Sequence, residues 1–360
     1  MKKIVTILGA RPQFIKAAVL SRIISEHNEI EEVIVHTGQH FDNNMSKVFF
    51  DEMKIPKPKY NLNINNVSHG AMTGLMLQKL DEILLNEKPD AVVVYGDTNS
   101  TLAGALAAKK LHIKLAHIEA GLRSFNMQMP EEINRIVTDR IADLLLCPTT
   151  VAIENVKKEA LEGMANIVNS GDIMKDAVEY YSELSAKKST ILKDLNLEED
   201  HYILSTVHRQ ENTTDLEVLA SILKALDRIN DDMKVIVPLH PRTKKIIKEN
   251  KLASSVTFIE PVGYFDMLAL LKNCKLVITD SGGLQKEAFF CKKPCVVLRE
   301  ETEWVELIDN GFAKIAGSDE ENIVFAYKYF KTATPNFSVQ LYGNNVGETI
   351  YNEIIKLLHT

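Results

Sequence analysis

Short apolar runs alternate along the whole chain with longer stretches whose apolar residues recur at helical spacing. The runs are continuous and rich in β-branched residues. Such runs are typical of strands in a parallel sheet that is covered on both faces by the intervening helices. We therefore predict an α/β protein with strands at 3–8, 32–37, 90–96, 114–118, 143–148, 202–207, 234–239, 256–261, 275–280 and 295–299.

The predicted elements fall into two series, which indicates two doubly wound domains. A polar stretch rich in Lys and Ser at 183–200 separates them, and the turn at 168–172 ends the first series. A chain of 360 residues also exceeds the length at which one core usually stops growing. We predict domains at 1–172 and 173–342, followed by a helical segment at 343–360.

Composition and charge narrow the classes of ligand. The formal net charge is −7 without long blocks of like charge, which argues against a nucleic-acid partner or an anionic membrane surface. The four cysteines lack the spacing of a metal site, so we expect ordinary thiols and no metal. We find neither a signal-peptide pattern nor an apolar run of the ~18 residues that span a bilayer, and we expect a cytoplasmic protein.

The first predicted strand leads into a turn and a helix that carry two cations. Gly9 permits a tight turn, and Pro12 suits the first helical position. The helix start would offer free N–H groups to an anion, with Arg11 and Lys16 adding positive charge. Surface cations that lie over a helix start give the same pattern. Neither a P-loop nor a dinucleotide fingerprint is present.

Polar residues also follow the next predicted strands. Gln39 and His40 come directly after the second strand, where they reach a ligand at the sheet edge or form an ordinary loop. Asp97 follows the strand at 90–96 and precedes a helix, so it is a candidate site residue or a simple helix cap.

Two more carboxylates are expected at the same edge. Glu119 follows the strand at 114–118, and Glu131 lies four residues before Arg135 on a predicted helix. A Glu–Arg pair at this spacing is usually a solvated surface ion pair. Together with Asp97, however, these glutamates form a set in which one carboxyl can act as base while another acts as acid.

In the second half, basic residues follow two predicted strands. His208 and Arg209 come at the start of a helix, a good position for a phosphate or a leaving oxyanion. His240 lies between two prolines after the next strand, where it belongs to a site or to an ordinary turn.

The loop after the strand at 275–280 is the most informative. Ser281, Gly282 and Gly283 enter a helix with bare N–H groups, which suits a diphosphate. Glu287, about one turn later, can accept two hydroxyls of a ribose.

Taken together, these segments resemble the non-hydrolysing UDP-N-acetylglucosamine 2-epimerases over nearly the whole chain. The motifs that carry the resemblance are GARPQFIK, YGDTNST, HIEAGLR, PEEINR, HRQEN, SGGLQKEA and the YGN turn near the end. The resemblance implies the GT-B architecture, which consists of two Rossmann-like domains with the nucleotide sugar in the cleft. It also implies a homodimer and a last helix that returns to the first domain.

The resemblance assigns roles to individual residues. Those that would hold the UDP are Arg11, Ser281, Gly282, Gly283 and Glu287, with His208 and Arg299 near the phosphates. The acid and base carboxylates would be Asp97, Glu119 and Glu131, with His208 also a catalytic candidate. Further candidates for substrate contact are Lys16, Gln39, His40, Arg135, Arg209 and His240.

The implied reaction inverts carbon 2 of UDP-N-acetylglucosamine and gives UDP-N-acetylmannosamine. This carbon is not acidic, and the chain has no dinucleotide fingerprint, so we expect no cofactor. Elimination offers a route, in which a carboxylate removes the proton on carbon 2 while UDP leaves from carbon 1 and gives a 2-acetamidoglucal. Reprotonation on the opposite face and return of UDP complete the inversion.

Some segments depart from the family pattern. Phe41 and Asp42 replace an expected Gln, an Arg expected near 65–74 is missing, and HRREN has become HRQEN. Activation by a second substrate molecule, which bacterial members often show, is therefore not expected. Trp304 stands where many members have Arg-Pro, which favours relatives that act on UDP-2,3-diacetamido-2,3-dideoxyglucuronic acid.

Three other classes share some of these features. A GT-B glycosyltransferase explains the SGG turn but does not need three carboxylates in the first domain. A hydrolysing epimerase would release free N-acetylmannosamine, but its first loop usually reads GTRA. A nucleotide-sugar sensor leaves the carboxylates unexplained.

Overall fold

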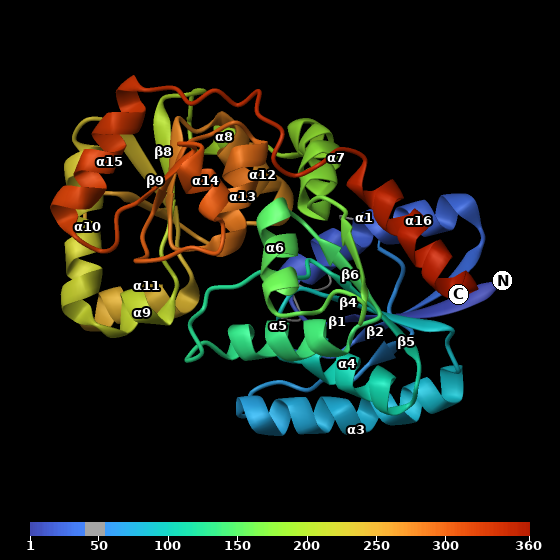
Figure 1. The fold of residues 1–360 in the computed structure, drawn as a ribbon. Helices are drawn as coiled ribbons and strands as arrows, with labels where there is room; N and C mark the ends of the chain where they lie inside the picture. Colours follow the sequence, from blue (N-terminus) through green and yellow to red (C-terminus); the bar gives the residue numbers. More distant parts are fainter. Residues whose placement is uncertain (40–54) are drawn as a thin grey trace. The chain divides into compact units, whose positions relative to one another are not determined.

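The computed structural model describes residues 1–39 and 55–360 of the chain. Within them the chain divides into two compact units, and Figure 1 labels many of their elements. Unit 1 comprises Met1–Ala177 and Leu341–Thr360, and unit 2 comprises Val178–Gln340. Each unit is built on a parallel sheet, so the α/β class predicted from the apolar runs is confirmed.

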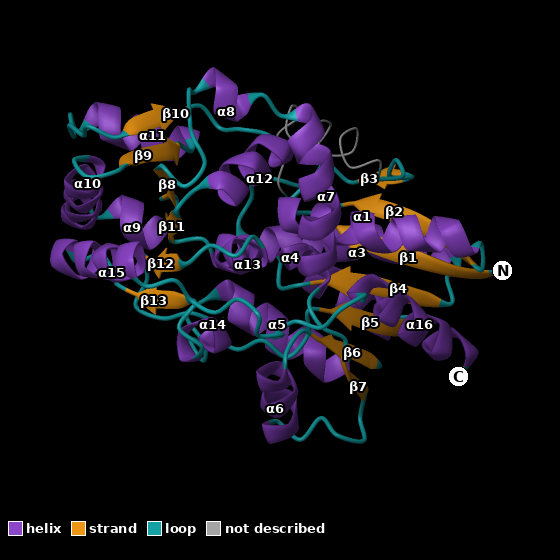
Figure 2. Cartoon of the chain, turned by 90° about the horizontal axis from the view of Figure 1, so that it is seen from above, coloured by secondary structure: helices purple, strands orange, loops and turns teal. Residues whose placement is uncertain are grey.

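The strands of unit 1 form one parallel sheet. They are β1 (Lys2–Leu8), β2 (Ile30–His36), β3 (Tyr60–Asn61), β4 (Ala91–Tyr95), β5 (Lys114–Ile118), β6 (Leu144–Cys147) and β7 (Asn166–Asn169). Their order is β3-β2-β1-β4-β5-β6-β7, as Figure 2 shows. The direction of winding reverses between β1 and β4, which makes the sheet doubly wound.

Helices cover both faces of this sheet. They are α1 (Arg11–His27), α3 (His69–Glu87), α4 (Asn99–Lys110), α5 (Pro130–Ile141), α6 (Thr150–Lys158) and α16 (Val346–His359). Helices α1 and α16 lie over one face, and α3, α4 and α5 lie over the other (Figure 1). The strands are continuous apolar runs because both faces are covered, and every residue of β4 is buried.

The last helix packs closely on the first. A Cβ at Gly347 would lie 2.6 Å from Ile23 Cδ1 and 2.9 Å from Val19 Cγ1 of α1. The Gly347 N–H also donates to Asp176 Oδ2 at 2.8 Å. A glycine is therefore needed where α16 begins its contact with α1.

The polar stretch at 183–200 is largely helical and is not an extended linker. It contains the end of α7 (Ile173–Lys188) and the short α8 (Ile191–Asp194). Helix α7 begins in unit 1 and ends in unit 2. In unit 2 its Ser185 hydroxyl donates to the Phe265 carbonyl at 2.5 Å, and the Tyr181 ring meets the edge of Tyr264.

The strands of unit 2 form a second parallel sheet. They are β8 (Tyr202–Thr206), β9 (Lys234–Pro238), β10 (Thr257–Ile259), β11 (Leu276–Thr279), β12 (Cys295–Val297) and β13 (Ala313–Ile315). Their order is β10-β9-β8-β11-β12-β13, so the winding reverses between β8 and β11. The short edge strands β3, β7 and β13 were not predicted, because runs of two to four half-exposed residues carry little apolar signal.

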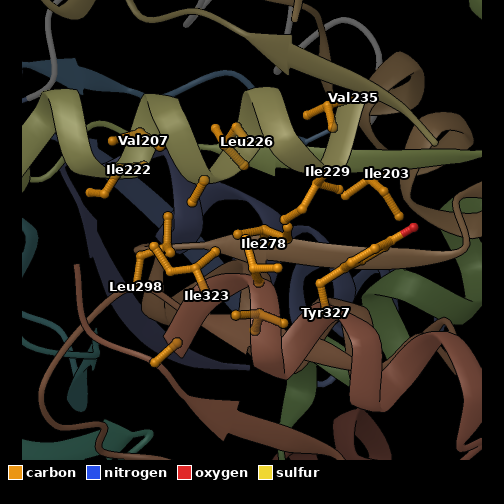
Figure 3. Close-up of a cluster of buried hydrophobic side chains, with 14 of the residues drawn as sticks. Ile203, Val207, Ile222, Leu226, Ile229, Val235, Ile278, Leu298, Ile323 and Tyr327 are labelled. Atoms are coloured by element: carbon orange, nitrogen blue, oxygen red, sulfur yellow. The ribbon is translucent and has the colours of Figure 1, made fainter. Parts of the chain in front are cut away.

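A hydrophobic core lies between this sheet and two of its helices. The helices of unit 2 after α8 are α9 (Gln210–Thr214), α10 (Leu216–Asn230), α11 (Pro241–Glu249), α12 (Tyr264–Asn273), α13 (Gly282–Phe290), α14 (Val305–Asp309) and α15 (Glu320–Thr332). Leu226 of α10 and Ile323 of α15 face Ile278 of β11 in this core (Figure 3). All three are 0% exposed, and full burial of such a side chain contributes about 1.5–3 kcal/mol.

One buried carboxyl in unit 1 weakens the fold at neutral pH. The carboxyl end of Glu32 lies inside, where Oε1 accepts from Thr6 Oγ1 at 2.6 Å and Oε2 has no hydrogen-bond partner in the described chain. Burial raises the pKa of Glu32 above its ordinary value. The unfolded chain therefore loses this proton at lower pH than the folded protein does, so stability falls as pH rises above about 4.5.

We expect Glu32→Gln to raise the melting temperature at pH 8 and to leave it nearly unchanged at pH 4, because the amide needs no proton to stay neutral. Differential scanning calorimetry at both pH values measures this difference. Glu31→Gln, an exposed neighbour on the same strand, is the control. A Glu32→Gln protein that gains nothing at pH 8 would contradict the assignment of a buried carboxyl with a raised pKa.

Candidate active site

Both sheets reverse their winding between strands whose carboxyl ends lead into polar loops. In unit 1 these strands are β1 and β4, and in unit 2 they are β8 and β11. Ligands of doubly wound sheets bind beyond the carboxyl ends of the strands at such a reversal. The loops that follow these strands are therefore the candidate binding loops.

The turn after β1 is closed by a glutamine. Gln13 Oε1 accepts from the N–H groups of Gly9 at 2.8 Å and Ala10 at 3.0 Å. Its amide nitrogen donates to the Tyr95 carbonyl at 2.7 Å and so ties this turn to the end of β4. Gln13 therefore occupies the N–H groups of Gly9 and Ala10, which precede the helix. The anion site predicted at the start of the helix itself stays a prediction. Arg11 begins α1 and is half-buried.

Lys16 forms a buried ion pair with Glu119, the residue that follows β5. The two side chains are 7% and 10% exposed. Glu119 has a φ of 70°, a conformation that few residues other than glycine adopt. A Cβ at Gly96 would lie 3.2 Å from Glu119 Oε2, so the turn after β4 runs directly beside the pair. Lys16 thus neutralises the charge of Glu119. The sequence pattern around Lys16 did not indicate this pairing.

Asp97 forms an ion pair with Arg135 of α5. Asp97 Oδ2 accepts from Nε at 3.0 Å and Nη2 at 2.7 Å. The Arg135 side chain is 5% exposed and that of Asp97 is 32% exposed. The cap of α4 is Thr98, whose Oγ1 accepts from the Thr101 N–H. The alternative that Asp97 is merely a helix cap is therefore excluded.

The two neighbouring glutamates of α5 have opposite surroundings. Glu132 is 1% exposed and accepts from the N–H groups of Ser124 at 3.0 Å and Phe125 at 2.9 Å. It also accepts from Arg135 Nη1 at 2.6 Å. Glu131 is half-buried and makes no hydrogen bond or ion pair with the described residues. The surface pair considered between Glu131 and Arg135 does not form, because Arg135 points to Glu132 instead.

A buried charge network that sequence analysis missed lies next to these loops. His117 of β5 and Asp139 of α5 are fully buried and share a hydrogen bond of 2.7 Å. Asp139 Oδ2 accepts from Arg123 Nη1 at 2.7 Å and from the Gly121 N–H at 3.0 Å. Arg123 in turn donates two hydrogen bonds to Glu159. The available signal was a histidine between apolar residues of a strand, Ala116 and Ile118.

Gln39 supports the start of α4. Its Oε1 accepts from the Ser100 N–H at 3.1 Å and the Ser100 hydroxyl at 2.8 Å. A contact of Gln39 with substrate stays a prediction. His40, the other residue predicted in this loop, lies outside the described residues.

In unit 2 the turn after β8 is built on the buried Asp280, which follows β11. Asp280 Oδ2 accepts from the N–H groups of His208 and Arg209, both at 2.9 Å. The His208 side chain is 44% exposed, with Nδ1 3.4 Å from Asp280 Oδ1. The Arg209 side chain makes no hydrogen bond or ion pair with the described residues. Asp280 thus joins the two strand ends at the reversal and holds the backbone of two basic residues.

His240 caps α11 as a neutral ring. Its Nδ1 accepts from the Arg242 N–H at 3.3 Å. Burial, followed by the charges of His208 and Arg242, lowers the pKa of His240. The predicted contact of His240 with substrate stays a prediction, and this ring would bring no positive charge to it.

Helix α13 begins at the same reversal with an open first turn. Ser281 Oγ accepts from the Leu284 N–H at 3.4 Å. Apart from its chain neighbours and the backbone of the helix itself, no described atom lies within 4 Å of the position of a Cβ on Gly283. A Cβ on Gly282, in contrast, would press on the Glu303 side chain. Glu287 is half-buried further along the helix. Its open start gives α13 the form that suits an anion.

Arg299, after β12, is buried against a carboxylate. Its Nη1 lies 2.8 Å from Glu303 Oε2, and the side chains are 3% and 9% exposed. Lys286 of α13 lies over the Trp304 ring, 3.9 Å from the centroid. The predicted contact of Arg299 with a phosphate stays a prediction, because Glu303 already meets its charge.

Comparisons with known proteins agree over the length of the chain. The family model described as UDP-N-acetylglucosamine 2-epimerase matches residues 22–354. The UDP-2,3-diacetamido-2,3-dideoxy-D-glucuronate 2-epimerase of Pseudomonas aeruginosa is 52% identical, over 95% of this chain and 96% of its own. A UDP-N-acetylglucosamine 2-epimerase of Methanococcus maripaludis is 43% identical over 98% of each chain.

A solved structure gives the same result. The UDP-N-acetylglucosamine 2-epimerase of Methanocaldococcus jannaschii, in complex with UDP-N-acetylglucosamine and UDP, superposes with a TM-score of 0.90. It is 40% identical and covers 100% of both chains.

Two parallel α/β units with loops of this kind define a protein of the GT-B class. The chain belongs to the UDP-N-acetylglucosamine 2-epimerase family, as the motifs indicated. Within residues 1–39 and 55–360, no helix combines the length and apolar character that crossing a bilayer requires.

Proposed function

We propose that the protein is a non-hydrolysing epimerase that inverts carbon 2 of a UDP-N-acetylhexosamine, interconverting UDP-N-acetylglucosamine and UDP-N-acetylmannosamine. Family membership supports this reaction class. The observation that carries the proposal is the pair of ion-paired carboxylates, Asp97 and Glu119, on either side of Gly96 at the reversal of unit 1.

The reaction proceeds by elimination and re-addition. A carboxylate takes the proton from carbon 2, the electrons of that bond form the double bond to carbon 1, and the bond from carbon 1 to oxygen breaks with its electron pair leaving on UDP. Protonation of carbon 2 from the opposite face and attack of the UDP oxygen on carbon 1 give the epimer. UDP must stay bound from the elimination step until the re-addition step, which requires a site that holds it firmly.

The carboxylates of unit 1 supply the acid and base. Asp97 and Glu119 each have a cationic partner, and Glu131 projects from α5, which Arg135 ties to Asp97. Proton transfer by positioned groups of this kind accelerates reactions by about 10²–10⁴-fold. The half-buried Glu131 makes no bond with the described residues that would have to break before it meets a substrate.

Residues of unit 2 hold the UDP. The open start of α13 binds the diphosphate through the N–H groups near Ser281 and Gly283, and Glu287 binds the ribose. The exposed His208 and the side chain of Arg209 stabilise the charge that develops on the leaving UDP.

UDP-2,3-diacetamido-2,3-dideoxyglucuronic acid is a second candidate substrate. The relative from Pseudomonas aeruginosa that carries this name is 52% identical, against 43% for the Methanococcus enzyme named for UDP-N-acetylglucosamine. The same chemistry at carbon 2 applies to both sugars.

Incubation of the protein with each UDP-sugar in heavy water tests the proposal. We expect deuterium on carbon 2 of recovered, intact UDP-sugar, because reprotonation draws on solvent, and mass spectrometry and proton NMR measure it. The sugar with the larger kcat/KM is the physiological class. A hydrolase would release UDP, and a glycosyltransferase or sensor would leave carbon 2 unlabelled, so either result would overturn the proposal.

We further propose that the protein acts as a cytoplasmic homodimer. All four cysteines are free thiols, which suits a reducing compartment, and family resemblance supports the dimer. Light scattering coupled to size-exclusion chromatography gives the oligomeric state directly.

A further inference from the structure

His117, which is not one of the proposed catalytic residues, contacts the backbone of Gly96, next to Asp97 and Glu119. His117 Nε2 lies 2.7 Å from the Gly96 carbonyl oxygen, and Nδ1 lies 2.7 Å from Asp139 Oδ1. The His117 and Asp139 side chains are 0% exposed. A carbonyl and a carboxylate only accept hydrogen bonds, so the ring makes both contacts when both of its nitrogens carry protons.

The partners of Asp139 keep this carboxylate ionised inside the protein. Burial alone would raise the pKa of Asp139, but the hydrogen bond and charge of His117, with the Arg123 guanidinium, hold it below its ordinary value. The network joins the His117 ring and Arg123 to two carboxylates, Asp139 and Glu159. Such pairing lets charged side chains remain inside the protein.

The backbone of Gly96 links the ends of β4 and β5. The Gly96 N–H donates to the Ile118 carbonyl at 2.9 Å, and the Gly96 carbonyl accepts from His117. Asp97 directly follows Gly96, and Glu119 directly follows Ile118. The two bonds therefore fix the starting points of the two catalytic candidates relative to each other.

The backbone conformation of this turn is tightly restricted. Gly96 has a φ of 61°, in the left-handed region, and a Cβ there would press on Glu119 Oε2 at 3.2 Å. The peptide that carries the Gly96 carbonyl leads directly into Asp97, which pairs with Arg135. The His117 donor is thus the contact that holds the carbonyl of this peptide in place.

We propose that His117 is a positioning residue of the epimerase, which fixes the Gly96 carbonyl and thereby sets the geometry between Asp97 and Glu119. This inference rests on the proposed function. It assigns a task to the buried network that stability alone does not require, because proton transfer depends on placing the carboxylates to within a fraction of an ångström.

Two amide substitutions separate the contacts of the ring. In His117→Gln the amide nitrogen reaches the place of Nε2, so it can still donate to the Gly96 carbonyl while the bond to Asp139 is lost. In His117→Asn the amide nitrogen takes the place of Nδ1, so the bond to Asp139 is kept and that to Gly96 is lost. Both introduce a neutral amide at the same position, so the two variants are matched in charge.

The measurement is deuterium incorporation at carbon 2, as kcat and KM per folded molecule, beside UDP affinity by titration calorimetry. We expect His117→Asn to lower kcat about 10–100-fold with KM and UDP affinity unchanged, and His117→Gln to stay within about fivefold of the wild type. Equal rates for the two variants, or a wild-type rate for His117→Asn, would overturn the inference. Absence of exchange in the wild-type protein would instead overturn the proposed function.

If both substitutions of His117 prevent folding, Asp139→Asn provides a second test. The introduced amide can donate to Nδ1, so a neutral ring keeps the proton on Nε2 and its bond to Gly96. We expect this variant to lose stability yet to exchange within about fivefold of the wild type. A loss beyond tenfold per folded molecule would show that the charge network, and not the contact with Gly96, sustains activity.

Discussion

Asp97→Asn lowers deuterium incorporation at carbon 2 by about 10²–10⁴-fold, the range that one acid or base contributes, while UDP still binds. The amide keeps the size of the side chain and can still accept from Arg135 Nε and Nη2, so the turn stays folded. It can neither take nor give a proton at the pH of the assay. Isotope exchange measured beside UDP titration separates chemistry from binding.

Asp90→Asn is the matched control for this change. Asp90 lies just before β4, at the opposite end of the strand from Asp97, and its Oδ1 is paired with Lys2 at 3.0 Å. We expect this variant to exchange at the wild-type rate. Asp97→Asn with more than a tenth of wild-type exchange would remove Asp97 from the acid–base set.

We expect Glu131→Gln to lose activity but keep its stability, and Glu132→Gln to lose stability. Glu131→Gln lowers exchange about 10²–10⁴-fold and leaves the free energy of unfolding within about 0.5 kcal/mol, because the side chain has no partner in the described chain. Glu132→Gln costs about 3 kcal/mol of stability, because a buried carboxylate bound to two N–H groups and Arg135 becomes an amide.

The pH dependence of stability sharpens this contrast. Burial opposes ionisation of Glu132, but the N–H groups of Ser124 and Phe125 and the Arg135 charge hold its pKa below the ordinary value of 4.5. Its contribution to stability is therefore present above pH 4.5 and is lost as pH falls through the lower, folded value. The stability difference between wild type and Glu132→Gln should shrink toward pH 3.

Urea unfolding at pH 7 and pH 3, beside exchange per folded molecule, measures both variants. The assignment of roles on α5 would be wrong if Glu132→Gln proved as stable as the wild type at pH 7. It would also be wrong if Glu131→Gln exchanged normally.

The sequence predicted the fold class because most interior strands are nearly continuous apolar runs. β4 and β11 are buried along their whole length, so the signal does not depend on neighbouring elements. β7, with two exposed ends, lies at the sheet edge and gives no such signal. The loops that follow the interior strands could also be predicted, because parallel strands deliver their carboxyl ends to one edge.

The partners of the site residues could not be predicted in the same way. Lys16 and Glu119 are separated by about a hundred positions, and their pairing depends on how α1 and β5 pack on one sheet. Arg135 could face Glu131 or Glu132 by helical spacing, and the position of Asp97 decides between them. Gln13 was missed because a polar residue in a first turn is usually read as solvated.

Unit 1 is built from two separate segments of the chain, so its parts are synthesised at different times. Translation completes all of unit 2 before α16, the segment that covers Val19 and Ile23 of α1, leaves the ribosome. In nascent unit 1 an apolar stripe of α1 therefore stays exposed while some 160 further residues are synthesised. A premature stop anywhere in unit 2 would leave that stripe bare and make the truncated product a target for chaperones and proteases.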